Sequence, residues 1–237
     1  MFEHSVEDHL VMGLSDLKSG AKYSLIAYLL SLLIVAAAFM MFPSLLGGGM
    51  RVPSTNLTAL ISLGIFLLLV GIAILVVVIV ALYKFYRATG HLREFDPRLG
   101  LGRTGILLVI LGIVVLLLGT SIAGLSIGLT APRMGPSAIL GAIFSIVGIV
   151  ILGVALVVIG DILFAVMVMR LAEIEGLDRG FRIAGALYIA SVVLSFVPYI
   201  GVAGYAIGLV STFLIYTYSK NSLESFKGGK KEGEEGS

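Results

Sequence analysis

This 237-residue chain contains no cysteine and no tryptophan. The lack of cysteine excludes a disulfide framework, a thiol nucleophile and a cysteine-ligated metal, and it leaves the redox compartment undetermined. Charge is also scarce, because Asp, Glu, Lys and Arg make up only 13% of the residues, about half the share found in soluble globular proteins. With 59% hydrophobic residues, the composition predicts a protein that lies mainly in lipid.

The apolar segments also lack the residue combinations that intramembrane enzymes use. Asp161 is the one acidic residue inside an apolar run, whereas an aspartyl protease needs two carboxylates. A serine protease or a haem site would need histidine or lysine at membrane depth, and His4, His9 and His91 all lie outside the apolar runs. No phosphate-binding loop is present. We therefore expect neither enzymatic activity nor a cofactor.

Six apolar segments follow one another along the chain. Their runs are continuous rather than alternating, which predicts helices and not a β-barrel. A helix needs about 20 apolar residues to cross a hydrocarbon core of ~30 Å. The fifth segment offers only ~16, or ~24 Å of helix, so residues 183–219 form either two spans joined by a tight turn or a re-entrant unit. The segments are 21–42, 57–83, 104–131, 137–169, 183–197 and 199–219.

Lysine and arginine gather on one side of these segments. Of the 16 basic residues, only Arg51 and Arg133 fall on the other side, so the positive-inside rule predicts that both termini are cytoplasmic. The expected fold class is all-α: a polytopic bundle of six transmembrane helices in three hairpins, in the cell membrane. The similar basic and aromatic hairpin ends fit either a threefold repeat or the usual preference of such residues for that boundary.

Three regions are expected. Residues 1–16 form an amphipathic cytoplasmic segment, residues 17–219 the transmembrane domain, and residues 220–237 a charged, disordered tail. In the first region, apolar residues spaced by four and three predict a helix that lies in the interface or packs on the bundle. Histidines and acids occur there too, at Glu3, His4, Asp8 and His9, but we expect no metal site. The apolar residues are Phe2, Val6, Leu10, Leu14 and Leu17.

Asp161 is costly at membrane depth and is therefore the first candidate for function. It lies nine residues from Arg170, or ~13 Å along a helix. Counting nine residues inward from other basic residues reaches three serines and an adjacent threonine, which predicts a polar layer. Without a counter-ion at this depth, Asp161 is expected to be protonated and bonded to hydroxyls. The hydroxyl residues are Ser31, Ser191, Ser211 and Thr212.

Glycines recur at sevens along several segments. Small residues at this spacing let two helix backbones approach closely, which supplies packing that hydrophobic burial cannot provide in lipid. Gly204 and Gly208 stand four apart and predict a similar small face. These glycines predict close helix packing and an oligomer or a membrane-protein partner. The candidates are Gly64, Gly71, Gly105, Gly112, Gly119, Gly141, Gly148, Gly153, Gly160, Gly204 and Gly208.

The loop from Tyr83 to Arg103 mixes aromatic and basic side chains, which next to membrane spans favours contact with lipid headgroups over nucleic acid. Its G-x-G-x-x-G pattern opens a membrane helix with no strand nearby, so it predicts a turn and not a nucleotide site. On the opposite side, Asn56 begins a glycosylation triplet. The headgroup candidates are Lys84, Arg87, Arg93, Arg98 and Arg103.

Two short motifs, LKSGAKY at residues 17–23 and FVPYIG at residues 196–201, resemble an archaeal family of multi-spanning membrane proteins, domain-of-unknown-function family 973. The resemblance implies an archaeal cytoplasmic-membrane protein and transfers no functional residue.

Two functions are compatible with these patterns. The first is a non-enzymatic accessory or scaffold subunit of a membrane complex or homo-oligomer. The alternative is a small transporter or channel for a proton, cation or small solute that uses the polar layer at Asp161.

Overall fold

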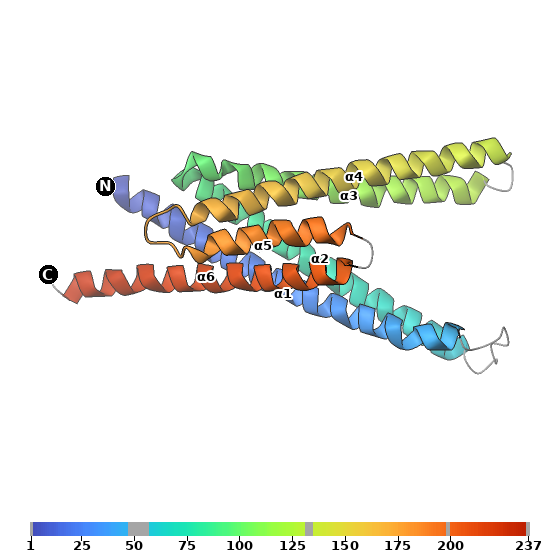
Figure 1. Cartoon of the computed structure of the whole chain (residues 1–237), viewed down its shortest axis with the longest axis horizontal. Helices are drawn as coiled ribbons and strands as arrows, with labels where there is room; N and C mark the ends of the chain where they lie inside the picture. The colour runs from blue at the N-terminus through green and yellow to red at the C-terminus, as the bar shows by residue number, and fades with distance from the viewer. Residues whose placement is uncertain (1, 47–56, 131–134, 198–199, 236–237) are drawn as a thin grey trace.

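The computed structural model describes residues 2–46, 57–130, 135–197 and 200–235, which form an all-α bundle with no strand in those ranges (Figure 1). One short 3-10 helix, η2 (Pro97–Leu99), joins the second α-helix to the third. The α-helices are α1 (Phe2–Leu46), α2 (Leu57–Phe95), α3 (Gly100–Thr130), α4 (Pro136–Leu171), α5 (Gly180–Ser195) and α6 (Gly201–Glu235).

Consecutive helices pair as three hairpins, α1 with α2, α3 with α4, and α5 with α6, which confirms the expected pairing. Helix α6 also packs on α1 and α5 on α4, so the third hairpin joins the other two, whereas α2 and α3 contact each other sparsely. In Figure 1 the first two hairpins diverge with increasing distance from the end that holds the start of α1 and the end of α6.

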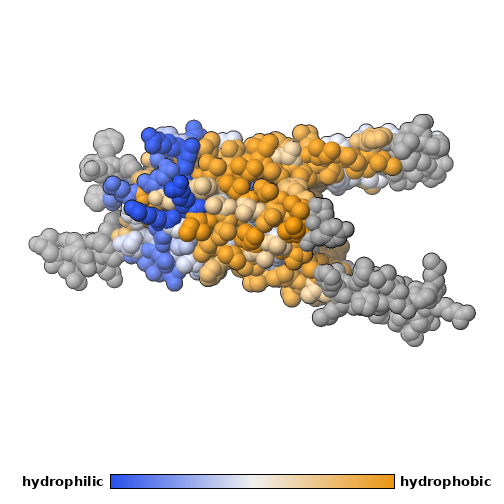
Figure 2. Space-filling view, in the orientation of Figure 1, coloured by the Kyte–Doolittle hydropathy of each residue, from blue (hydrophilic) through white to orange (hydrophobic). Residues whose placement is uncertain are grey.

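Among the described residues, five helices are long and apolar enough to cross a membrane, over Glu7–Ala36, Gly64–Phe95, Pro97–Leu125, Gly141–Leu171 and Gly201–Phe226. Helix α5 is shorter, with 16 residues. The surface beyond the hydrophilic band is almost continuously apolar (Figure 2), and it carries side chains such as Leu68, 63% exposed, and Phe144, 73% exposed. An apolar surface of this extent needs lipid or another protein to cover it, so the protein is membrane-embedded.

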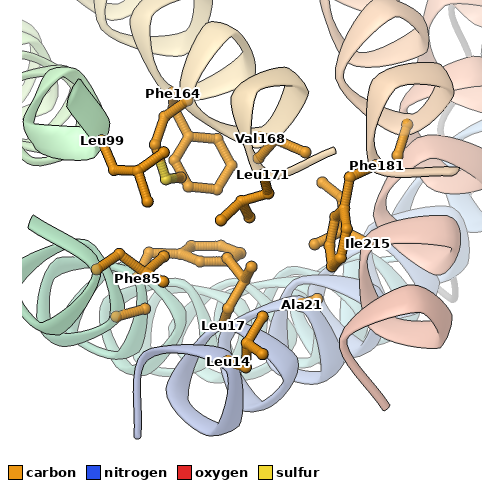
Figure 3. Close-up of a cluster of buried hydrophobic side chains, with 14 of the residues drawn as sticks. Leu14, Leu17, Ala21, Phe85, Leu99, Phe164, Val168, Leu171, Phe181 and Ile215 are labelled. Carbon is orange, nitrogen blue, oxygen red and sulfur yellow. The ribbon is translucent and has the colours of Figure 1, made fainter. Parts of the chain in front are cut away.

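The most closely packed core lies towards the end of the bundle that carries the charged residues. Leu14 and Leu17 of α1 meet Phe85 of α2, Val168 of α4 and Phe181 of α5 there, each 8% exposed or less (Figure 3). Full burial of such a side chain contributes about 1.5–3 kcal/mol. Along α2, no residue from 64 to 80 is buried. The three hairpins are therefore held together at one end.

The expected boundary between residues 16 and 17 differs from the structure, because α1 is continuous from Phe2 to Leu46. Its apolar stripe packs on the bundle, which was one of the two expected arrangements: Leu10, Leu14 and Leu17 are almost fully buried. Asp16 adds polar contacts at this end, since its carboxylate lies 3.0 Å from Lys84 Nζ and 3.4 Å from Arg87 Nε. The N-terminal segment is thus part of the bundle.

The expected disordered tail also differs from the structure, because α6 continues as a helix to Glu235. Leu223 is buried in the main core, and Phe226 packs against that core and lies next to Gly176 in the α4–α5 connection. The Ser222 hydroxyl accepts a hydrogen bond from the Asp178 amide at 3.4 Å. Leu223 and Phe226 lie three positions apart on one helix face, so their packing stabilises the helix beyond the last apolar run.

Candidate functional site

Asp161 projects from α4 towards α5, one residue after a close contact between α4 and α3. The Tyr188 hydroxyl of α5 donates a hydrogen bond to Asp161 Oδ1 at 3.1 Å. Within the described residues this is the one protein hydrogen bond to the carboxyl, and no Lys, Arg or His there forms an ion pair with it. The carboxyl therefore keeps acceptor positions that the protein leaves open.

Asp161 lies in the wall of a cavity of about 300 Å³ to which all six helices contribute. Most of the lining is aliphatic and aromatic, and its polar groups are Asp161 and the hydroxyls of Ser24, Ser31, Thr212 and three tyrosines, Tyr28, Tyr188 and Tyr205. Apolar residues of α2 and α3 form one side of the cavity, where these two helices contact each other sparsely. A largely apolar cavity with a few converging polar groups is the usual form of a small-ligand site.

A second cavity, of about 340 Å³, shares Asp161 and the same three tyrosines with the first. It extends to Val154, seven residues farther from the charged end than Asp161, or ~10 Å along α4. The first cavity reaches Phe85, which belongs to the core at the charged end. Asp161, Tyr28, Tyr188 and Tyr205, the Asp161 cluster from here on, therefore stand where two cavities at different depths meet.

Helices α1 and α6 hold the rest of the Asp161 cluster. The Tyr205 hydroxyl donates to the Tyr28 carbonyl oxygen and also contacts Ser31 Oγ. Ser31 donates to the same carbonyl at 2.8 Å. The rings of Tyr28 and Tyr205 meet edge to face, with centroids 4.9 Å apart. These contacts fix the half-buried Tyr28 and Tyr205 between α1 and α6, and a tyrosine hydroxyl away from water usually finds such a hydrogen-bond partner.

The glycine at position 208 makes room for Tyr28. A Cβ atom added there would lie 2.8 Å from the Tyr28 hydroxyl oxygen, closer than such atoms normally approach. Farther along the wall, Phe164 meets the ring of Tyr188 edge to face, with centroids 5.8 Å apart, and meets Phe85 at 5.0 Å. Aromatic rings from α1, α2, α4, α5 and α6 thus line the first cavity together with the carboxyl.

The predicted hydroxyl layer is only partly brought together. Ser31 and Thr212 line the first cavity and Ser191 lines the second. Ser211 lies outside both: it is fully buried and donates to the Ala184 carbonyl oxygen at 2.8 Å. None of the four bonds the carboxyl in the described structure; Thr212 and Ser191 donate to backbone oxygens of their own helices instead, at 2.8 Å and 2.7 Å.

Three tyrosines, Tyr28, Tyr188 and Tyr205, line both cavities with Asp161, and Tyr188 bonds its carboxyl; none of the three was predicted from the sequence. A signal for them exists, because Tyr28 stands six residues from Lys22 and Tyr188 six from Arg182, ~9 Å from the basic boundary on each helix. A tyrosine inside an apolar run needs a partner for its hydroxyl. Equal depth on two helices would have indicated that these two hydroxyls lie in one layer.

Several of the predicted packing glycines lie at close contacts between α3 and α4 and between α5 and α6. A Cβ at Gly105 would lie 2.5 Å from the Gly160 carbonyl oxygen, and one at Gly112 would lie 2.7 Å from that of Gly153. Gly119 faces Ile149, and Gly204 faces the α5 backbone near Ser195. Four others have no atom of the described structure within 4 Å of such a Cβ: Gly64, Gly71, Gly141 and Gly148.

The predicted headgroup residues have protein partners in several cases. Lys84 and Arg87 face Asp16. Arg103 donates to the Tyr86 hydroxyl at 2.8 Å and lies over the Tyr86 ring. Arg93 and Arg98 are exposed, so these two remain the best placed for headgroups. The predicted glycosylation site, Asn56, lies outside the described residues.

Comparison with known proteins gives one match. A family model described as "Protein of unknown function (DUF973)" matches residues 11–231, which cover α2 to α5 completely and most of α1 and α6. No curated protein and no solved structure matches the chain.

Proposed function

The chain belongs to the DUF973 family, as the two short motifs indicated, and from that premise we propose that it is a non-enzymatic transport protein. Its ligand is a small, singly charged cation with an apolar body. The observation that carries this proposal is the Asp161 carboxyl, which has one hydrogen-bond partner within the described residues and stands where two cavities meet. An ionisable group at membrane depth is costly and is retained where it binds something.

The chemistry of the lining favours a cation with an apolar body. No Lys, Arg or His lines either cavity, so an anion would meet Asp161 and no countercharge. A cation would gain the carboxylate and the surrounding rings, and aromatic rings contribute about 0.5–2 kcal/mol to binding a cation. The apolar walls suit a ligand that partitions into lipid and reaches the site between α2 and α3.

The proposal includes a membrane topology. We retain six spans with both termini cytoplasmic, on the bias of Lys and Arg to one side and on the position of both chain ends at one end of the bundle (Figure 1). Helix α5, with 16 residues, is then a short span of ~24 Å. Such a span requires a thinner local bilayer or cover from its neighbours α4 and α6.

The binding experiment compares three probes of the same size and different charge. Phenyltrimethylammonium is the cation, tert-butylbenzene its neutral isostere and benzenesulfonate an anion. Calorimetry on the full chain in lipid nanodiscs should show that the cation binds, that Asp161→Asn weakens its binding at least about tenfold, or 1.4 kcal/mol, and that the anion does not bind. The matched control is Glu173→Gln, which removes an exposed carboxyl in the α4–α5 connection.

Equal binding of the cation and its neutral isostere, or an unchanged affinity in Asp161→Asn, would refute the proposed charge recognition. Passage needs a second measurement, and the absence of native cysteine makes it direct. Ser31→Cys, in the first cavity, should react with a small cationic thiol reagent, whereas Ser211→Cys, outside both cavities, should not. Equal resistance of both cysteines in native membranes would rule out an open path to Asp161.

A scaffold role is the second candidate, because four glycines on α2 and α4 have no neighbour among the described atoms close to the position of an added Cβ. Gly64, Gly71, Gly141 and Gly148 lie on parts of the hairpins that diverge, and small residues in lipid mark surfaces where another helix can approach closely. Single cysteines at Gly71 and Gly148 should cross-link two chains in native membranes if this role applies. A cysteine at Gly112, buried against α4, is the control that should not.

A further inference from the structure

A cluster of metal-binding side chains lies at the charged end of the bundle, away from the Asp161 cluster. His9 of α1 meets His91 and Glu94 of α2, and the nearest potential ligand atoms of the three all lie within 4.8 Å of one another. The sequence alone gave no reason to connect these positions, since 82 residues separate His9 from His91 (91 − 9).

The helix contact explains why these residues meet. Gly13 stands one turn after His9, and a Cβ there would lie 2.8 Å from Leu92 Cγ, so α1 and α2 approach closely at this level. Leu92 is fully buried and lies between the two ligand positions of α2 in sequence. His91 and Glu94 are three residues apart, which places their side chains on one face of α2. The α1–α2 packing thus holds all three together.

The two imidazole nitrogens that face the cluster have no hydrogen-bond partner in the described structure. His9 Nδ1 and His91 Nδ1 are both buried atoms without one. His9 Nδ1 lies 2.9 Å from Glu94 Oε2 without forming a hydrogen bond, and His91 Nδ1, at 4.0 Å from the same oxygen, is too far away to form one. Buried polar atoms normally find a partner, and a cation between the nitrogens and the carboxylate would provide one.

We propose that His9, His91 and Glu94 bind a divalent transition-metal ion of the zinc type. Two imidazoles and one carboxylate suit Zn²⁺ and disfavour Mg²⁺ and Ca²⁺, which prefer oxygen ligands. Zinc–ligand distances of about 2.0–2.2 Å require the three atoms to move closer together. The exposed Glu94 side chain, 58% accessible, leaves room for that movement. Three protein ligands leave a fourth position for water.

The bound ion would connect the N-terminal part of α1 to the end of α2. This contact differs from the core beneath it, because it forms only when the metal is present. Zinc would therefore stabilise the α1–α2 hairpin at the charged end in proportion to its concentration. This inference is independent of the proposed function, since none of its ligands lines either cavity at Asp161.

The test measures Zn²⁺ binding by the full chain in detergent, free of any histidine tag, through competition with a chromogenic chelator. We expect one equivalent per chain, and an affinity at least about 100-fold weaker in His9→Gln and in His91→Gln, since even outer-shell changes cost about 10–100-fold. Glu94→Gln should weaken binding in the same direction. The control is His4→Gln, which changes the remaining histidine of the chain.

Unchanged zinc binding in His9→Gln and His91→Gln, absence of binding by the unmodified chain, or its loss in His4→Gln would each overturn the proposal. Folding is checked by gel filtration of every variant. Because Glu94 is exposed, Glu94→Gln keeps the test decisive if a histidine variant does not fold. A second readout follows the hairpin itself: zinc should slow hydrogen exchange in residues 7–13 of the unmodified chain and not in His91→Gln.

Discussion

Substitution of Gly105 by alanine tests the α3–α4 packing most directly. The added Cβ would lie 2.5 Å from the Gly160 carbonyl oxygen and 2.9 Å from the Phe164 amide nitrogen. Both neighbours are backbone atoms, so no side chain can rotate away and the helices must separate. Overpacking of this kind costs about 1–3 kcal/mol, which exceeds the gain of up to about 1 kcal/mol in helix propensity when alanine replaces glycine.

The free energy of unfolding can be measured by SDS titration of the purified chain, followed by circular dichroism. We expect Gly105→Ala to lower it by about 1–2 kcal/mol. Gly64→Ala is the matched control, because it makes the same chemical change where no atom of the described structure lies within 4 Å of the new Cβ. In the double variant with Gly160→Ala, the second substitution should cost less than it does alone, because the helices have already separated.

Equal stability of Gly105→Ala and Gly64→Ala would refute this reasoning, since the steric difference between the two positions is its whole basis. Strict additivity in the double variant would show that the two glycines do not share one contact.

Two further predictions concern the charged end. The Asp16 carboxylate has little exposure and faces Lys84 and Arg87. A double-mutant cycle of Asp16→Asn and Lys84→Gln should therefore give a coupling free energy of about 1 kcal/mol, at the upper end for partly exposed pairs. A coupling free energy of zero would mean that apolar packing alone holds the N-terminal part of α1. Leu223→Ser should speed hydrogen exchange in residues 220–226, because Leu223 holds the α6 extension to the core, whereas exposed Glu224→Gln should not; equal exchange in the two variants would contradict that role.

Hydropathy alone was sufficient to place the helices and hairpins. Each apolar segment lies largely within one helix, and the segments pair in sequence order. The C-terminal extension of α6 was missed because hydropathy averages over many residues. Leu223 and Phe226 are only two apolar residues in a polar stretch, and they stabilise the helix because they are covered by the core and by the α4–α5 connection. Sequence shows the two residues but not the surface that receives them.

The depth of the candidate site's residues in the membrane was predictable from the sequence, whereas the direction in which each side chain points from its helix was not. Counting from the basic boundary identified Ser31 and Ser211 as equal in depth. Rotation about the helix axis then separates them: Ser31 faces the cavity, and Ser211 faces the Ala184 carbonyl oxygen in the α5–α6 contact. That rotation is set by the packing of neighbouring helices, which a single sequence does not reveal. The same limit explains why the sequence alone did not distinguish Gly105, which packs against the α4 backbone, from Gly64, which has no described atom within 4 Å of an added Cβ.

The hairpins α1–α2 and α3–α4 are joined at one end only, and this has a mechanical consequence. Ala81 of α2 is buried, and none of residues 64–80 before it is. From Ala81 to Leu57 at the start of that helix is 24 residues (81 − 57), or ~36 Å. A rotation of about 5° at the joined end would move the far end of such a helix by ~3 Å. Asp161 lies close to the joint, so any change there of the distance between α4 and α5 is magnified along the hairpins. Short displacements beside the carboxyl thus correspond to changes in width of several ångströms at the opposite face.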